Sequence, residues 1–214
     1  MEELINQVQR FKQWSSKYSP SELYGEWECD YPDWIYLYKA VQEFIASHSL
    51  IGEWSSEQLD LVLYTLARDN ECQHIVKQLR NNCPESLIQL ATLSIKLGEP
   101  DAKWQLAQEL GELQSNTKTI ETILMELAHD SSEYVRRCAL ISLAKIKSEL
   151  TEELALNSWH QPHENQEWAR MAVLWCLNKI DSPHFEVLRL KAEVDSRPYL
   201  LEYAKKARQK DFKL

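Results

Sequence analysis

Four side chains near residue 165 have the residue types of a metal site. His160 and His163 are followed by Glu164 and Glu167, and imidazole and carboxylate groups are ordinary zinc ligands. Pro162 interrupts the helical spacing between the two histidines, and no third strong ligand is evident. The remaining histidines are isolated, without a nucleophile partner that sequence can show. We therefore predict a solvated loop at this place, and a chain with no catalytic residue, no metal and no cofactor.

The glycine content excludes several kinds of cofactor chemistry. The chain has only four glycines in 214 residues, at positions 25, 52, 98 and 111. They are too far apart to form a Gly-rich phosphate loop, a dinucleotide-binding fingerprint or a nucleophile elbow. Tight turns between strands also use glycine, so an all-β fold is not expected.

The apolar residues recur at three- and four-residue steps along nearly the whole chain, which is typical of amphipathic helices. Breaks rich in Pro, Asn, Asp and Ser separate these stretches, and Ser55 or Ser56 is placed to cap one of the helices. We predict helix pairs at about 56–81, 85–113, 117–147, 150–180 and 183–210. The stretches 135–146 and 169–180 match at an offset of 34 residues, which indicates repeats of two helices each.

The stretch from Asp130 to Ala139, DSSEYVRRCA, resembles the second helix of a HEAT repeat, in which an Asp precedes the helix and Val-Arg is followed by a small residue. The resemblance covers residues 85–180 best. It implies an all-α fold, a right-handed α-α superhelix of about five HEAT-like helix pairs. Residues 1–54 would form an N-terminal helical cap, and residues 55–214 one continuous repeat array. Repeat arrays have no single function in common.

The same resemblance implies structural roles for three charged residues and binding roles for several aromatic ones. Asp130 and Arg136 would link neighbouring repeats, with Arg170 at the matching position, although Asp130 alone could instead cap the helix. Second helices line the concave surface of HEAT-like arrays, so their aromatic residues are candidate anchors or, alternatively, packing wedges between repeats. The partner-binding candidates on these helices are Trp104, Tyr134, Arg137, Trp168 and Trp175.

Residues 21–60 combine acidic and aromatic side chains. This window contains nine acidic residues, one lysine and eight aromatic residues, which is not the composition of a disordered acidic tail. It predicts an ordered acidic surface whose large anchors suit a basic protein partner. The alternative is a capping helix with buried aromatic rings and solvated acids. The partner-binding candidates here are Tyr24, Glu26, Trp27, Glu28, Asp30, Tyr31, Asp33 and Trp34.

The overall charge and the cysteines bear on partners and compartment. A net charge of −9 makes nucleic acid an unlikely partner, because phosphate neutralisation needs clustered Lys and Arg. Residues 189–214 carry +4, which is typical of a solvated terminal helix. Five widely spaced cysteines fit a reducing cytoplasm, and no membrane span or signal peptide is predicted.

These observations favour a cytoplasmic protein-binding solenoid. The specific hypothesis is an inhibitor that sterically blocks a basic protein, in the manner of bacterial immunity proteins that neutralise toxin domains; the resemblance to them is one of size and charge. One alternative is an enzyme, an alkylpurine DNA glycosylase or a chromophore lyase, since both classes are built on HEAT-like repeats. The other is a general scaffold or adaptor.

Overall fold

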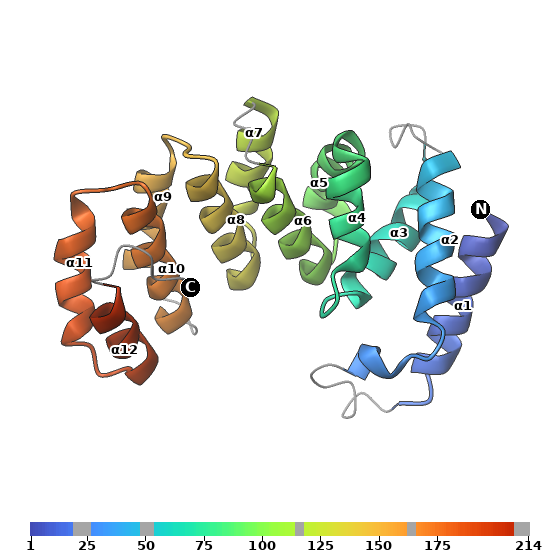
Figure 1. Ribbon diagram of the computed structural model, residues 1–214, viewed down its shortest axis with the longest axis horizontal. Helices are drawn as coiled ribbons and strands as arrows, with labels where there is room; N and C mark the ends of the chain where they lie inside the picture. The colour runs from blue at the N-terminus through green and yellow to red at the C-terminus, as the bar shows by residue number, and fades with distance from the viewer. Residues whose placement is uncertain (19–26, 48–53, 114–117, 162–165, 208–214) are drawn as a thin grey trace. The chain divides into compact units, whose positions relative to one another are not determined.

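The computed structural model describes residues 1–18, 27–47, 54–113, 118–161 and 166–207. Within these ranges the chain is helical, without a strand (Figure 1), so the predicted all-α class is confirmed for them. The helices are α1 (Glu2–Ser15), η1 (Trp27–Asp30), α2 (Trp34–Ser47), α3 (Ser56–Arg68), α4 (His74–Asn82), α5 (Pro84–Leu97), α6 (Pro100–Glu112), α7 (Lys118–Leu127), α8 (Glu133–Lys145), α9 (Thr151–His160), α10 (Gln166–Lys179), α11 (His184–Glu193) and α12 (Pro198–Lys206).

Local sequence signals fix where several helices begin. Ser55 is the N-cap of α3: its hydroxyl accepts from the Gln58 backbone N–H at 3.2 Å, while the Gln58 side chain accepts from the Ser55 N–H at 2.6 Å. This reciprocal pair is a capping box. Pro84 and Pro198 stand at the first positions of α5 and α12, where the missing N–H of proline costs nothing. The helices α3 to α12 begin and end within a few residues of the five predicted pairs.

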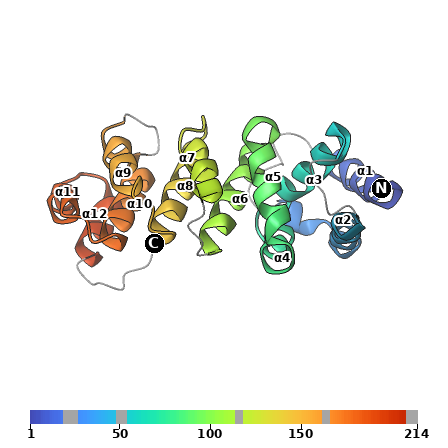
Figure 2. The ribbon, with the colours of Figure 1, turned by 90° about the horizontal axis from the view of Figure 1, so that it is seen from above.

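The chain divides into two compact units, Met1–Leu106 and Ala107–Leu214. In the first unit, α1 packs against α2 and α3, α2 against α4, and α4 against α5; Figure 2 shows α1 and α2 side by side, as does Figure 1. The segment predicted as a cap therefore shares one core with the helices that follow it.

Aromatic rings fill a large part of the core of the first unit. Phe11 is fully buried, and its ring lies 4.9 Å from the Tyr31 ring, 5.4 Å from Trp34, 5.7 Å from Trp14 and 6.2 Å from Tyr64, measured between centroids. Edge-to-face and tilted arrangements at these distances are favourable for aromatic pairs. We call these five residues the aromatic cluster.

The second unit is a stack of helix pairs. Within it α7 packs on α8, α9 on α10 and α11 on α12, while α10 also packs on α8 and α12. Its core is rich in leucine and alanine, and includes Trp159 and Tyr203. Cys138 and Cys176 are buried free thiols that pack as small hydrophobic residues.

Small residues allow close approach between helices in this unit. Gly111, near the end of α6, lies so close to Ser142 of α8 that a Cβ atom on it would stand 2.8 Å from the Ser142 Cα and 2.6 Å from its Oγ. Real Cβ atoms do not approach other atoms so closely. Gly111 is therefore required by packing, because any side chain there would push α6 and α8 apart.

Polar contacts connect residues of neighbouring helix pairs and of the turns beside them. Their partners are separated by 25 to 39 residues, about one repeat. This spacing is expected where each helix pair contacts its neighbours in sequence. The contacts are Arg68–Glu99, Gln105–Leu66, Glu112–Lys145, Glu121–Ser148, Arg170–Asp195 and Glu167–Leu200.

Candidate functional site

The predicted acidic and aromatic surface lies only partly within the described residues. Tyr24 and Glu26 fall outside them, and for Trp27 the structure places the backbone alone, at the start of η1. Asp30 is exposed and Asp33 is half-buried. These two are the predicted acids of this segment that the structure leaves accessible to a partner.

The other predicted residues of this segment are packed inside the first unit. Tyr31 is 4% exposed and belongs to the aromatic cluster. Trp34 is half-buried, and its indole N–H donates to the Glu28 backbone carbonyl at 2.7 Å. Glu28 itself is buried, with one carboxylate oxygen 3.9 Å from an Arg68 guanidinium nitrogen. Burial raises the pKa of the Glu28 carboxyl. Their placement is that of packing residues.

Two of the predicted tryptophans on second helices are also packing residues. Trp104 on α6 is buried, and its indole N–H donates to an Asp101 carboxylate oxygen at 3.2 Å. Trp175 on α10 packs against the core of the second unit. Trp104 is therefore covered by the fold, whereas Trp175 is half-buried.

The Asp130–Arg136 pair is arranged within one repeat. A carboxylate oxygen of Asp130 accepts from the Ser132 N–H at 2.8 Å, just before α8. The Arg136 guanidinium donates to the backbone carbonyls of Asp130 and Ser131, at 2.7 and 2.8 Å. Both residues thus shape the turn that precedes α8.

Arg170 joins α10 to the turn between α11 and α12. Its guanidinium lies 3.2 Å from a carboxylate oxygen of Asp195, in the turn between α11 and α12, and 5.0 Å above the Trp159 ring. Arg197 bonds the same Asp195 at 2.7 Å. The hydrogen bond from Arg197 is the main cause that lowers the pKa of Asp195 to about 2.

A stacked pair of aromatic rings is exposed at the N-terminal ends of α10 and α12. Trp168, the third residue of α10, is 43% exposed, and Tyr199, the second residue of α12, is 58% exposed. Their ring centroids are 5.7 Å apart with the planes 23° apart. We call Trp168 and Tyr199 the aromatic pair. The sequence analysis predicted Trp168 as a binding residue but not Tyr199. Tyr199 could have been found from its position, because it follows Trp168 by 31 residues and lies at the same end of the next second helix.

The N-terminal ends of α10 and α12 are held together beneath the aromatic pair. Glu167, next to Trp168, accepts a hydrogen bond at 2.9 Å from the backbone N–H of Leu200, next to Tyr199. Leu200 is the third residue of α12, so the carboxylate satisfies one of the N–H groups that a helix start leaves unpaired. This bond fixes the two helix ends, and therefore the two rings, relative to each other.

Tyr134 repeats the position of Trp168 one repeat earlier, as the second residue of α8. It is 40% exposed. The Arg137 guanidinium lies 4.7 Å from the centroid of its ring and bonds Glu133 at 3.0 Å. Of the predicted candidates in this unit, Tyr134 and Trp168 are exposed, and Arg137 is half-buried.

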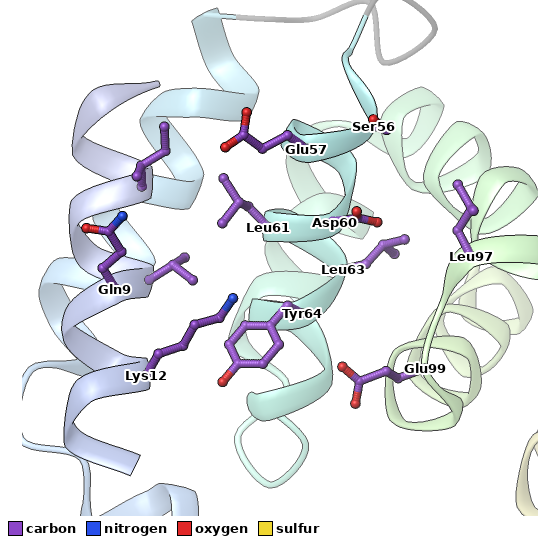
Figure 3. Close-up of a pocket in the computed structure, with 12 residues that line it drawn as sticks. Gln9, Lys12, Ser56, Glu57, Asp60, Leu61, Leu63, Tyr64, Leu97 and Glu99 are labelled. Carbon is purple, nitrogen blue, oxygen red and sulfur yellow. The ribbon is translucent and has the colours of Figure 1, made fainter. Parts of the chain in front are cut away.

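A groove lies in the first unit between α1, α3 and the α5–α6 turn, with a volume of about 540 Å³ (Figure 3). We call it the acidic groove. Its apolar lining includes Ile5, Val8, Leu61 and Leu97. Its charged and aromatic lining is Lys12, Glu57, Asp60, Tyr64 and Glu99.

The described residues contain no group of three metal-binding side chains; the predicted His163 and Glu164 lie outside them. In the same part of the chain, no helix is both long and apolar enough to cross a membrane. Neither the protein-family models nor the curated proteins compared with this sequence match it.

Proposed function

We propose that this chain is a protein-binding repeat protein, a HEAT-like array whose aromatic pair anchors a partner. The support for a repeat array is the order of helix pairs and the polar contacts that connect neighbouring pairs and the turns beside them at 25 to 39 residues. Such arrays offer long surfaces for proteins and no enclosed catalytic pocket.

The observation that carries the proposal is the exposed stack of Trp168 on Tyr199. Tryptophan and tyrosine are the residues that most often dominate binding energy at protein interfaces, because a rigid ring buries a large area with little loss of side-chain entropy. Arg170 and Arg197 follow and precede the two rings by two residues in the sequence, and both bond Asp195.

The same network favours a protein over a nucleic acid as the partner. Binding to phosphates needs arginines or lysines whose charge is not neutralised. Arg170 and Arg197 share Asp195, and Arg137 is paired with Glu133. Each of these three arginines therefore already has a carboxylate partner within the chain.

The specific role that we propose is inhibition of a basic protein by covering its active or substrate-binding face. The support is the charge of the first unit, where 16 acidic residues stand against 9 basic ones in residues 1–106. Opposite charges would speed the encounter, and the aromatic pair would supply affinity.

The test is affinity capture from extracts of the source cell with three baits. These are the natural chain, the double variant Trp168→Ala/Tyr199→Ala, and the control Leu190→Ala, which truncates an exposed apolar side chain on α11. We expect a protein that binds the natural chain and the control but is reduced at least about tenfold on the double variant, as hot-spot residues predict. The same protein, co-expressed, should form a stable complex.

Stability measurements accompany the capture. Because both rings are largely exposed, the double variant should lose no more than about 1 kcal/mol of unfolding free energy. Capture of the same proteins by all three baits would contradict the proposal that the aromatic pair is the anchor.

A further inference from the structure

The acidic groove offers apolar surface next to uncompensated negative charge. Leu97, at the end of α5, is 55% exposed at its edge, and Leu61 of α3 is half-buried. Figure 3 shows Leu61 and Lys12 on the α1 side of the groove, with Leu97 and Glu99 on the opposite side. Its volume of about 540 Å³ lies in the range of about 300–1,000 Å³ of pockets that bury a ligand. The space is sufficient for several side chains of a bound segment.

Two carboxylates of the groove have no cation of their own. Glu57 and Asp60 lie three residues apart on α3, both exposed, and so share one face of the helix. Within the described ranges neither forms an ion pair. The third carboxylate, Glu99, is paired with Arg68. Negative charge on α3 is therefore available to a ligand.

The aromatic ring of the groove, Tyr64, already has two cations against it. The Lys12 ammonium lies 4.6 Å from the Tyr64 ring centroid, and the Arg68 guanidinium lies 5.2 Å from it. Both distances are within the range of about 6 Å for cation–π attraction. Burial raises the pKa of the Tyr64 hydroxyl, so the ring stays neutral at ordinary pH and its face remains the attractive feature.

We propose that the acidic groove binds a cationic, amphipathic segment of the partner protein. Lysine or arginine side chains of that segment would pair with Glu57 and Asp60, and apolar side chains next to them would pack on Leu61 and Leu97. Charge complementarity selects this occupant: the lining has three carboxylates and one lysine, in a unit with 16 acidic and 9 basic residues. The proposal rests on the proposed function and names the chemistry of the partner.

The test is fluorescence anisotropy with a short labelled peptide of alternating lysine and leucine, and a second peptide in which glutamate replaces lysine. The full chain should bind the lysine peptide and not the glutamate one, with affinity that falls as salt is added. The variant Glu57→Gln/Asp60→Asn should bind the lysine peptide about tenfold more weakly, since it loses two exposed ion pairs with the peptide.

The matched control is Glu71→Gln/Glu85→Gln, which removes the same charge from exposed positions of the same unit outside the groove. It should change the affinity less than about twofold. Equal weakening by both double variants would overturn the proposal, because it would show attraction by net charge alone. So would an absence of binding by the natural chain, or equal binding of both peptides.

This experiment is separable from the capture experiment. The variant Trp168→Ala/Tyr199→Ala should keep its affinity for the lysine peptide, because neither ring lines the acidic groove. If the lysine peptide does not bind, the proposal for the acidic groove is wrong, but capture of a partner through the aromatic pair can still hold. If the peptide binds and the double variant captures the same proteins as the natural chain, the groove proposal holds and the proposal for the aromatic pair is wrong.

Discussion

In residues 1–106 a cluster of aromatic rings packs inside the fold, whereas in residues 107–214 a stacked aromatic pair lies on the surface and small residues allow close approach of the helices. Phe11 is the centre of the first arrangement, and the contact of Gly111 with Ser142 belongs to the second. A high density of Trp and Tyr in the sequence therefore does not by itself locate a binding surface. Their role depends on whether helices distant in the sequence close over them.

Truncation of the central ring should have the largest effect. Phe11→Ala removes a fully buried ring that contacts four others, so the unfolding free energy should fall by about 3–5 kcal/mol, from lost transfer energy and the cavity left behind. Urea denaturation followed by tryptophan fluorescence and by circular dichroism measures the loss.

The control for this prediction is Tyr36→Ala on α2, which truncates a ring that is exposed rather than buried. Its effect should be within about 0.5 kcal/mol. Similar losses for Phe11→Ala and Tyr36→Ala would mean that the aromatic cluster does not stabilise the first unit.

A single methyl group should disturb the close packing of the second unit. Alanine favours helices over glycine by about 1 kcal/mol, yet Gly111→Ala should lower the unfolding free energy by about 1–3 kcal/mol, because its Cβ would overlap Ser142. Denaturant unfolding of the variant checks the sign.

A double-mutant cycle identifies the cause of that loss. Ser142→Gly removes two of the three atoms that the new Cβ would meet, so Gly111→Ala should be less harmful in its presence, by about 0.5 kcal/mol or more. Strict additivity of the two substitutions would show that α6 and α8 are not in this contact.

A smaller effect, of opposite sign in the two units, should appear in the pH dependence of stability. Burial raises the pKa of Glu28 in the folded state above its ordinary 4.5, so the folded state binds more protons above that pH and stability falls as pH rises. Arg197 lowers the pKa of Asp195 from 3.8 to about 2, so its contribution is present above pH 3.8 and is lost as pH falls toward 2.

Unfolding free energies of the natural chain, Glu28→Gln and Asp195→Asn, measured across pH 2–7 in urea, test both signs. Relative to Glu28→Gln, the natural chain should become less stable as pH rises above about 4.5. Relative to Asp195→Asn, it should become more stable between about pH 2 and 4 and then level off. Slopes of the same sign would refute the contrast between a buried carboxylate and a paired one.

The helices were predictable from the sequence because their signals are local. Helical spacing of apolar residues, the serine before α3 and the prolines that start α5 and α12 act within one or two turns. The predicted pair at 85–113, for example, corresponds to α5 and α6 at Pro84–Glu112.

The accessible surface could be predicted only in part, since burial depends on contacts between distant residues. Trp104 and Trp168 are the same residue type on second helices, but the fifth position of α6 faces the core and the third position of α10 faces solvent. Tyr31 and Trp34 were predicted as anchors, with packing as the alternative, and α1 supplies the ring that packs against them. Composition alone contains no information about that contact.

The polar contacts that join neighbouring helix pairs have a consequence for synthesis of the chain. Each connects residues 25 to 39 positions apart, so the partners of a given helix leave the ribosome shortly after it does. Structure with such short sequence separation forms rapidly, and growing chains fold from the N-terminus. Within each unit a helix pair can therefore dock on the one made before it, and exposed apolar surface is covered while translation continues.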